Sequence, residues 1–252
     1  MRILVDLDGV IWRGSHIIPG VKDVFNLLSK DGVEVHFFTN NSYLTQRQLL
    51  IKLKVAGVKA TKINVHSSAV VAGEFLKGVK KAYVIGGPGI KEALRINKIE
   101  ISDKDPVETV VVGLDLKLSY QKLTKATYFI NNGAFFVATN SDPAYPLENN
   151  QLAPGAGAIV AALKTATGQA PVVLGKPHRP TISFLKKIGH FDLVIGDRLS
   201  TDFKLAQALN SKFVLVLSGV TDKKEIALKG LEKKFIVIKS VKDLPSTLRN
   251  IS

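Results

Sequence analysis

The sequence predicts an α/β fold that contains a mostly parallel β-sheet. Short apolar runs alternate with stretches of helical periodicity, the order that is typical of strand–helix–strand units. The 252 residues exceed the usual length of one domain, and 46% hydrophobic residues is ample for a core. We therefore expect one large or two smaller domains.

The first part of the chain predicts three strand–helix units. The apolar, β-rich run within 2–7 is typical of a strand buried on both faces of a parallel sheet. A helix is expected from about 20 to 30, because apolar residues recur there at helical spacing between Pro19-Gly20 and Gly32. The other predicted elements are strand 33–38, helix 45–55 with Thr45 as its cap, strand 62–66 and helix 67–77.

The segment from about 79 to 169 repeats this alternation and is interpreted as an inserted domain. Its hinges are expected near Gly78 and at 168–171. Strands are predicted at 83–85, 109–112 and 135–138, and helices near 89–97, 119–131 and 156–166. The first sheet is then expected to resume with strands at 171–174, 192–196, 213–217 and 235–238.

The charge is strongly positive, with 35 Lys+Arg against 21 Asp+Glu and a formal net charge of +14. Such a field attracts anions, including phosphorylated substrates and nucleic acid, but scattered lysines on a solvated surface are the favoured interpretation. The chain has no cysteine, which excludes disulfides and thiolate chemistry. It has no apolar run of about 18 residues, and its first residues do not resemble a secretory signal, so a cytoplasmic location is expected.

The end of the first predicted strand carries two acids, Asp6 and Asp8. Successive side chains of a strand point to opposite faces, so these two carboxylates are expected to share a face. Two acids this close repel each other unless a cation or a shared proton intervenes. Mg²⁺ prefers oxygen ligands, and a metal is therefore the natural resolution.

Three further strand ends carry groups that suit phosphoryl chemistry. Thr39 and Asn40 follow the second strand, Gly175-Lys176-Pro177 follows strand 171–174, and 197–202 follows strand 192–196. If these strands are adjacent and parallel, their ends meet at one edge of the sheet. The set would then supply a nucleophile, an acid/base, polar donors, a cation and metal ligands. Each piece alone could equally be a turn or a helix cap.

Other local patterns favour less specific interpretations. The glycines at 86–89 and 155–157 do not complete a dinucleotide-binding motif, and Asn40-Asn41-Ser42 as a glycosylation acceptor has no role in a cytoplasmic chain. None of the five histidines has metal-ligand spacing. His36 and His66 fall in predicted strands and are expected to be structural, whereas His178 could contact substrate.

Four stretches of the chain together resemble the four motifs of the haloacid dehalogenase-like hydrolases, which are mostly phosphatases. They are Asp6-Leu7-Asp8-Gly9-Val10, Thr39-Asn40, Lys176, and Gly196-Asp197 with Asp202. Further stretches resemble the NagD-like, 4-nitrophenyl phosphatase and phosphoglycolate or pyridoxal phosphate phosphatase branch. These stretches are 12–14, 18–20, 38–42, 138–142, 154–157, 175–177, 196–202 and 217–221. The resemblance implies a Rossmann-like parallel-sheet core, residues 1–78 and 170–252, with an inserted α/β cap domain (type C2) at 79–169.

The resemblance also implies a mechanism. Asp6 would attack phosphorus to form an aspartyl-phosphate, and Asp8 would protonate the leaving oxygen and then activate water. Mg²⁺ would be held by Asp6, the Asp8 backbone carbonyl and Asp197. Thr39 and Asn40 would bind phosphoryl oxygens, with Asn41 in the same substrate-binding segment. Lys176 would offset charge between nucleophile and phosphate, and Asp202 would orient water or Lys176.

In the same family, the segment that contains Asp142 and Tyr145 would reach over the site and select the substrate. Relatives that hydrolyse pyridoxal phosphate carry a histidine where Tyr145 stands, so that specificity is not expected. Tyr145 could instead be a loop aromatic that packs locally.

These features favour a Mg²⁺-dependent phosphatase of small phosphomonoesters, such as p-nitrophenyl phosphate, phosphoglycolate, and sugar or nucleotide phosphates. Phosphoryl transfer to another acceptor and dehalogenation would use the same scaffold, but Asp8 supplies the acid that a phosphate ester needs. A basic nucleic-acid-binding protein without catalysis is a third alternative, against which the intact acids and Lys176 argue. The expected partner is a small phosphorylated metabolite, with no membrane, and relatives suggest a homodimer through the cap.

Overall fold

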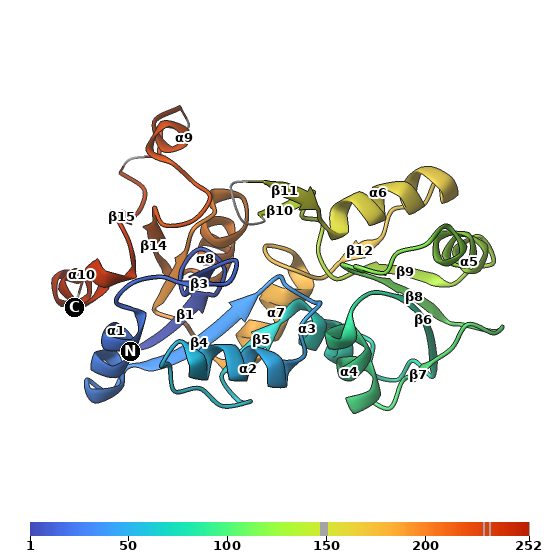
Figure 1. The fold of residues 1–252 in the computed structure, drawn as a ribbon, viewed down its shortest axis with the longest axis horizontal. Coiled ribbons are helices and arrows are strands. Elements are labelled where there is room, and N and C mark those ends of the chain that lie inside the picture. Colours follow the sequence, from blue (N-terminus) through green and yellow to red (C-terminus); the bar gives the residue numbers. More distant parts are fainter. Residues whose placement is uncertain (147–150, 229, 232, 252) are drawn as a thin grey trace. The chain divides into compact units, whose positions relative to one another are not determined.

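The computed structural model describes residues 1–146, 151–228, 230–231 and 233–251 (Figure 1). The chain forms two compact units. The first contains Met1–Thr39, Leu49–His66 and Ile182–Ser252, and the second contains Asn40–Gln48 and Ser67–Thr181. The chain therefore leaves the first unit and returns to it, as an inserted second α/β unit requires.

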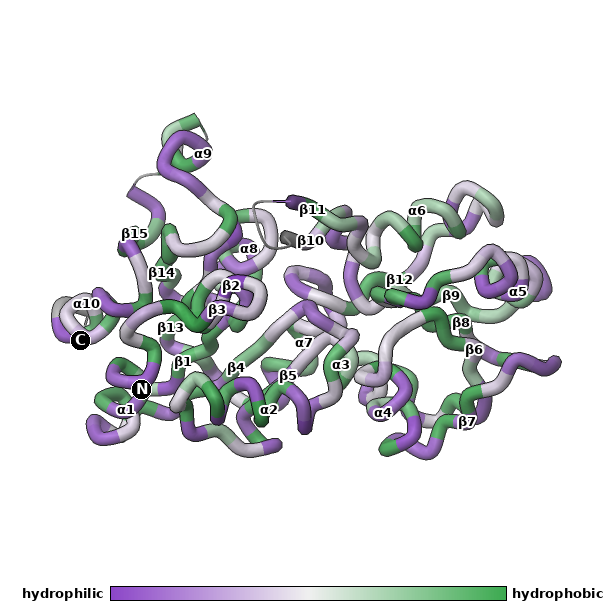
Figure 2. Tube along the Cα trace, viewed as in Figure 1, coloured by the Kyte–Doolittle hydropathy of each residue, from purple (hydrophilic) through white to green (hydrophobic). Residues whose placement is uncertain are grey.

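The first unit is built on a six-stranded sheet with the order β15-β14-β13-β1-β4-β5. The central strand β1 pairs in parallel with β13 on one side and with β4 on the other, so that Ile3 lies opposite both Leu193 and Val35. Ile3, Leu4 and Val5 are almost completely buried, which confirms a strand covered on both faces. Figure 2 colours the same chain by the hydropathy of each residue. The strands are β1 Arg2–Asp6, β4 Glu34–Thr39, β5 Val65–Ser67, β13 Leu193–Gly196, β14 Lys212–Val216 and β15 Ile236–Ile238.

Helix α1 illustrates how the helices of this unit follow from the sequence. It begins after Gly20, whose φ of 86° is in the left-handed region, and it buries Val21, Val24, Phe25 and Leu28 on one face. The helices that contribute to this unit are α1 Val21–Lys30, α2 Gln46–Val55, α7 Arg179–Ile188, the π-helical turn η2 Leu199–Phe203, α8 Lys204–Leu209, α9 Lys223–Leu228, the 3₁₀ turn η3 Val241–Asp243 and α10 Leu244–Ile251.

A short hairpin after β1 was not expected from the sequence. Strands β2 Trp12–Arg13 and β3 His16–Ile17 pair in antiparallel fashion, and the loop that leads to them folds back so that the N–H groups of Ile11 and Trp12 donate to the Leu7 carbonyl. Two-residue strands leave no periodic signal in the sequence.

The second unit contains a five-stranded parallel sheet with the order β12-β9-β8-β6-β7. Its core joins apolar residues of β6, β8 and β9 to one side of helices α5 and α6, including Val110, Phe129 and Ile159. A two-stranded antiparallel hairpin, β10–β11, lies in the same unit. The strands are β6 Lys81–Ile85, β7 Glu100–Ile101, β8 Thr109–Val112, β9 Phe135–Ala138, β10 Ala144–Pro146, β11 Leu152–Pro154 and β12 Val172–Val173.

Helix α3 packs against α4 in the second unit, although the sequence placed the segment 67–77 before the insertion. The helices of the second unit are α3 Ser68–Phe75, α4 Pro88–Ile96, α5 Tyr120–Asn131 and α6 Ala156–Thr167. The predicted helices near 89–97, 119–131 and 156–166 are confirmed to within one residue at each end.

The expectation that strand 171–174 belongs to the first sheet is wrong. Val172 and Val173 form the short strand β12, which pairs in parallel with Val137 and Ala138 of β9 in the second sheet. Val173 also packs against the core of that unit. The sequence could not reveal this, because a short apolar run followed by Gly-Lys-Pro fits the edge of either parallel sheet.

In the part of the chain that the structure describes, no helix has both the length and the apolar character needed to cross a membrane.

Two buried histidines pack together in the first unit, in agreement with a structural role. His36 Nδ1 lies 3.1 Å from His66 Nε2, and the two rings stack with centroids 5.4 Å apart. His36 Nε2 lies 2.9 Å from Glu34 Oε1, while Phe184 packs edge-on against His66. Burial, and secondarily the neighbouring His36, lowers the pKa of His66 from 6.5 to about 4.

This pair predicts acid-sensitive stability. The unfolded chain binds a proton on His66 below pH 6.5 and the folded chain only near pH 4, so the free energy of unfolding should fall as pH drops between these values, by about 3 kcal/mol. Above pH 6.5 this contribution is constant. Urea unfolding at pH 7 and pH 4.5 should show a smaller loss for His66→Gln than for the unmodified protein. His190→Gln, at an exposed histidine, should match the unmodified protein; equal losses in all three would contradict the assignment.

Candidate active site

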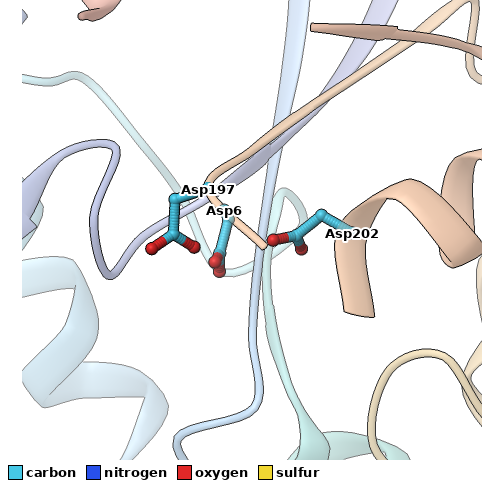
Figure 3. Close-up of side chains that lie close together, drawn as sticks. All are labelled: Asp6, Asp197 and Asp202. Atoms are coloured by element: carbon cyan, nitrogen blue, oxygen red, sulfur yellow. The ribbon is translucent and has the colours of Figure 1, made fainter. Parts of the chain in front are cut away.

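Three carboxylates meet at the carboxyl ends of adjacent strands of the first sheet. Asp6 ends β1, Asp197 follows β13, and Asp202 lies in the π-helical turn that comes next. One oxygen from each lies within 4.8 Å of the others, and Figure 3 shows the three groups gathered together. Because β1 and β13 are parallel neighbours, the fold itself brings Asp6 and Asp197 to the same edge.

Backbone N–H groups orient each of these acids. Asp6 Oδ1 accepts from Leu7 N at 2.8 Å, Asp197 Oδ2 from Val220 N at 2.8 Å, and Asp202 Oδ2 from Arg198 N at 3.1 Å. Asp197 and Asp202 are almost completely buried. The sequence placed Asp202 behind the ligands; in the structure one of its carboxylate oxygens lies within 4.8 Å of an oxygen of Asp6 and of Asp197.

The donor set suits a hard divalent cation. Three carboxylates at this distance repel one another unless positive charge lies among them, and carboxylate oxygens are the ligands that Mg²⁺ selects. Glycines also make room at the cluster, since a Cβ built on Gly9 or Gly219 would collide with the Asp197 carboxylate. The residues present therefore fit a metal of this kind.

Asp8 is held apart from the three-carboxylate cluster. Its Oδ1 accepts a hydrogen bond from Trp12 Nε1 at 3.0 Å, and its Oδ2 accepts one from Thr39 Oγ1 at 3.1 Å. The two acids of the Asp-x-Asp pair thus have different surroundings, because β1 ends at Asp6 and the chain turns before Asp8. Such a difference allows two carboxylates to have two chemical roles.

Asn40 is the centre of a network in the second unit. Its Oδ1 accepts from the Lys176 backbone N–H at 2.7 Å, and its Nδ2 donates to the Lys176 carbonyl at 3.2 Å and to Asp142 Oδ2 at 3.3 Å. Asn140 Nδ2 donates to the Asn40 carbonyl and to Asp142 Oδ2. The side chain of Asn40 therefore fixes the backbone at Lys176, a role that the sequence did not suggest.

Two other residues singled out from the sequence have local partners. Asn41 Oδ1 accepts from the backbone N–H groups of Tyr43 and Leu44, which is the geometry of an Asx turn. Tyr145 is half-buried in β10, opposite Ala153 of β11. Sequence reasoning gave no role to Trp12 or Asn140, and the only signal for either was its place inside a recognised motif.

An open parallel sheet with a carboxylate cluster at its strand ends is an arrangement that suits metal-assisted chemistry. Residues 3–100 match the family model of haloacid dehalogenase-like hydrolases, and residues 173–244 match a second model described as HAD-hydrolase-like. The chain belongs to the haloacid dehalogenase-like hydrolases.

Its relatives in this family are named as phosphatases. The chain is 37% identical to Phosphoglycolate phosphatase 2 of Arabidopsis thaliana, over 90% of this chain and 86% of that protein. It superposes on the p-nitrophenyl phosphatase from Archaeoglobus fulgidus with a TM-score of 0.89 and 31% identity, over 98% of both chains. A glycerol phosphate phosphatase from Mycobacterium tuberculosis in complex with magnesium gives a TM-score of 0.85 and 30% identity, over 96% of this chain and 75% of that one. The enzyme class is that of hydrolases acting on phosphoric monoester bonds.

The glycine at position 9 predicts a specific defect. Gly9→Ala is expected to displace the Asp197 carboxylate and to weaken binding of a divalent cation ~10-fold to 100-fold. Gly32→Ala is a matched control, because Gly32 also has a positive φ, of 67° against 83° at Gly9, but its Cβ would meet no atom within 4 Å. Calorimetric titration with Mg²⁺ measures the effect, and equal affinities in the two variants would contradict it.

Proposed function

We propose that the protein is a Mg²⁺-dependent phosphatase of small phosphomonoesters that works through an aspartyl-phosphate on Asp6. The observation that carries this proposal is the carboxylate cluster of Asp6, Asp197 and Asp202 beside an Asp8 that is held separately by Trp12 and Thr39. This reaction needs a nucleophile beside a metal, and an acid/base whose carboxyl group does not bind that metal.

The metal would be held by the side chains of Asp6 and Asp197, with the Asp8 backbone carbonyl as a further ligand. Bound there, Mg²⁺ would neutralise charge on the phosphoryl group and orient it. The burial of Asp197 and the glycine cradle formed by Gly9 and Gly219 support this assignment. Asp202 lies close enough to the cluster to act as a ligand itself or to hold a metal-bound water.

The covalent step divides hydrolysis into two displacements. Asp6 attacks phosphorus while the bond to the ester oxygen breaks, and Asp8 gives that oxygen its proton, which releases the alcohol. The carboxylate of Asp8 then takes a proton from water, which attacks the aspartyl-phosphate and releases inorganic phosphate and Asp6. Both protons pass through one carboxyl group, so Asp8 returns to its starting state.

The phosphoryl oxygens are proposed to be bound by the Thr39 hydroxyl, the Asn40 backbone N–H and the ammonium group of Lys176. The carboxamide of Asn40 is already engaged by Lys176 and Asp142, which supports the backbone N–H as the group that Asn40 contributes. The same contacts restrain the backbone of Lys176. Asn41 would act by shaping the turn after Asn40.

Residues 79–169 are proposed to act as a cap domain on a catalytic core drawn from 1–78 and 170–252, although helix α3 and strand β12 pack in the second unit. Asp142 and Tyr145 would select the substrate, and a homodimer would form through the cap. In support, Asp142 is held by the side chains of Asn40 and Asn140, and Tyr145 follows it at the start of the β10–β11 hairpin. A segment restrained in this way presents a defined surface to a ligand.

The substrate is proposed to be a small phosphorylated metabolite. Phosphoglycolate, glycerol phosphate and p-nitrophenyl phosphate, which appear in the names of the relatives, all carry a compact group beyond the ester oxygen. A formal net charge of +14 favours approach of such anions.

Phosphate release from these three esters, measured with Mg²⁺ and after chelation, tests the proposal. We expect turnover that requires Mg²⁺ and an acid-quenched protein that retains radiolabelled phosphate from a labelled ester. Release of halide from haloacids without phosphate release, or salt-sensitive DNA binding without any turnover, would favour the alternative activities instead.

A further inference from the structure

Asp8 is connected to two side chains that no step of the reaction uses, Trp12 and Lys52. We propose that Trp12, backed by Lys52, is a positioning residue that holds the Asp8 carboxyl group and determines which of its oxygens carries the proton delivered to the leaving group. This inference rests on the proposed function, because it assumes that Asp8 is the general acid and base.

The indole of Trp12 is itself firmly placed. Only 1% of its surface is exposed, and Trp12 forms the start of the β2–β3 hairpin, opposite Ile17. The backbone closes a loop around Asp8, since Gly9 N donates to the Trp12 carbonyl at 2.7 Å and Trp12 N to the Leu7 carbonyl at 3.3 Å. Asp8 and its donor therefore belong to one short, internally bonded turn.

Lys52 of helix α2 covers the indole ring. Its Nζ lies 4.1 Å from the ring centroid and donates to the Gly14 carbonyl at 3.1 Å, so it joins the helix to the turn of the hairpin. A cation over an indole face is attracted by the ring's quadrupole. Burial lowers the pKa of Lys52, whereas the charge of Asp8 raises it, so the lysine also interacts electrostatically with the acid that the indole contacts.

The two groups that donate hydrogen bonds to Asp8, the Trp12 indole N–H and the Thr39 hydroxyl, differ in whether they can also accept one. An indole N–H can only donate, so Asp8 Oδ1 must accept whether or not the carboxyl group is protonated. A hydroxyl can both donate and accept, so the proton of the acid form is tolerated on Oδ2, beside Thr39. Trp12 thus favours the form in which Oδ2 carries the proton, and this sets the direction in which the proton is delivered.

Trp12→Phe keeps an aromatic ring beneath Lys52 but removes the N–H donor, together with part of the buried ring volume. We expect kcat for glycerol phosphate to fall ~10-fold to 100-fold with KM within about twofold, because a misplaced acid loses part of the usual contribution of proton transfer. The loss should be smaller for p-nitrophenyl phosphate, whose leaving group needs little protonation. In an Asp8→Asn background, Trp12→Phe should have no further effect.

Lys52→Met tests the second member of the pair, with Lys54→Met on the same helix as its control. Lys54 is exposed, whereas Lys52 is half-buried over the ring. We expect Lys52→Met to lower kcat for glycerol phosphate ~3-fold to 10-fold and Lys54→Met to leave it unchanged.

Trp12 is the only tryptophan of the chain, so its fluorescence reports on this contact without any assay of activity. Asp8→Asn and Lys52→Met should each shift the emission spectrum, while Lys54→Met should not. These variants retain Trp12, and they keep the inference testable if Trp12→Phe fails to fold.

Three results would overturn the inference. These are equal losses for the two esters, additive effects of Trp12→Phe and Asp8→Asn, or an emission spectrum that neither Asp8→Asn nor Lys52→Met changes. If Asp8→Asn itself left kcat unchanged, the proposed function would fail first, so the two failures are distinguishable.

Discussion

Asp6→Asn should lower phosphate release by at least ~10³-fold, because the change removes the nucleophile on which both chemical steps depend. An amide has nearly the shape of a carboxylate, and its oxygen can still accept from the Leu7 N–H. Substrate binding and the fold should therefore change little. Rates of release from p-nitrophenyl phosphate at saturating Mg²⁺ measure the loss.

The exposed Asp23 of helix α1 provides a matched control, since Asp23→Asn makes the same chemical change far along the chain from the cluster. Asp6→Asn should also retain no labelled phosphate after acid quenching. Removing one of three neighbouring carboxylates reduces their mutual repulsion, so the variant without metal should be at least as stable as the unmodified protein. A variant that is active and still labelled would show that another residue is the nucleophile.

Asp197→Asn should weaken Mg²⁺ binding by at least ~10²-fold, because it removes the charge of a proposed ligand in the buried part of the cluster. A ligand that binds only the folded state stabilises it by about 2.7 kcal/mol at one hundred times its dissociation constant. The unmodified protein should thus melt at a higher temperature when Mg²⁺ is added at such an excess, and Asp197→Asn should lose most of this shift. Thermal unfolding with and without Mg²⁺ measures it.

Asp31→Asn, at an exposed acid that follows helix α1, should keep the full shift. The asparagine at position 197 can still accept from Val220 N, so its apo form should fold normally. A variant that loses stability without metal, yet keeps the shift with it, would mean that Asp197 is a structural acid and that the cation binds elsewhere.

The separation of Asp8 from the cluster bears on the alternative activities. A dehalogenase expels a halide that needs no proton, so it gains nothing from an acid that two donors hold in place beside the site. A phosphate ester releases an alkoxide, and protonation of that oxygen is what Asp8 can supply. The contacts of Asp8 therefore favour ester hydrolysis over dehalogenation on chemical grounds.

Much of the fold could be predicted because local patterns of apolar residues along the chain determine where strands and helices form. The apolar run at 3–5 predicted a strand buried on both faces, and the spacing of Val21, Val24, Phe25 and Leu28 predicted the buried face of α1. Both depend on which residues neighbour each other along the chain. The alternation of these elements was sufficient to predict the parallel α/β fold class.

The sequence predicted which segments form strands and helices more accurately than it predicted which sheet or unit each one joins. The run at 171–174 was expected in the first sheet, but β12 pairs with β9 in the second. Helix α3 likewise packs on α4 in the second unit, although the insertion was expected to begin only near residue 79. A short strand or helix can satisfy its hydrogen bonds and bury its apolar side in either unit, so only the packing partners decide.

By itself, the sequence determined the order of strands and helices, the acids that end β1 and follow β13, and the family. Only the tertiary structure decided that Asp202 lies with Asp6 and Asp197. It also decided that the Asn40 carboxamide hydrogen-bonds Lys176 and Asp142, and that the Trp12 indole hydrogen-bonds Asp8. The physical reason is that a motif specifies which groups are present near a strand end, whereas hydrogen-bond geometry and burial are set by residues distant in the chain.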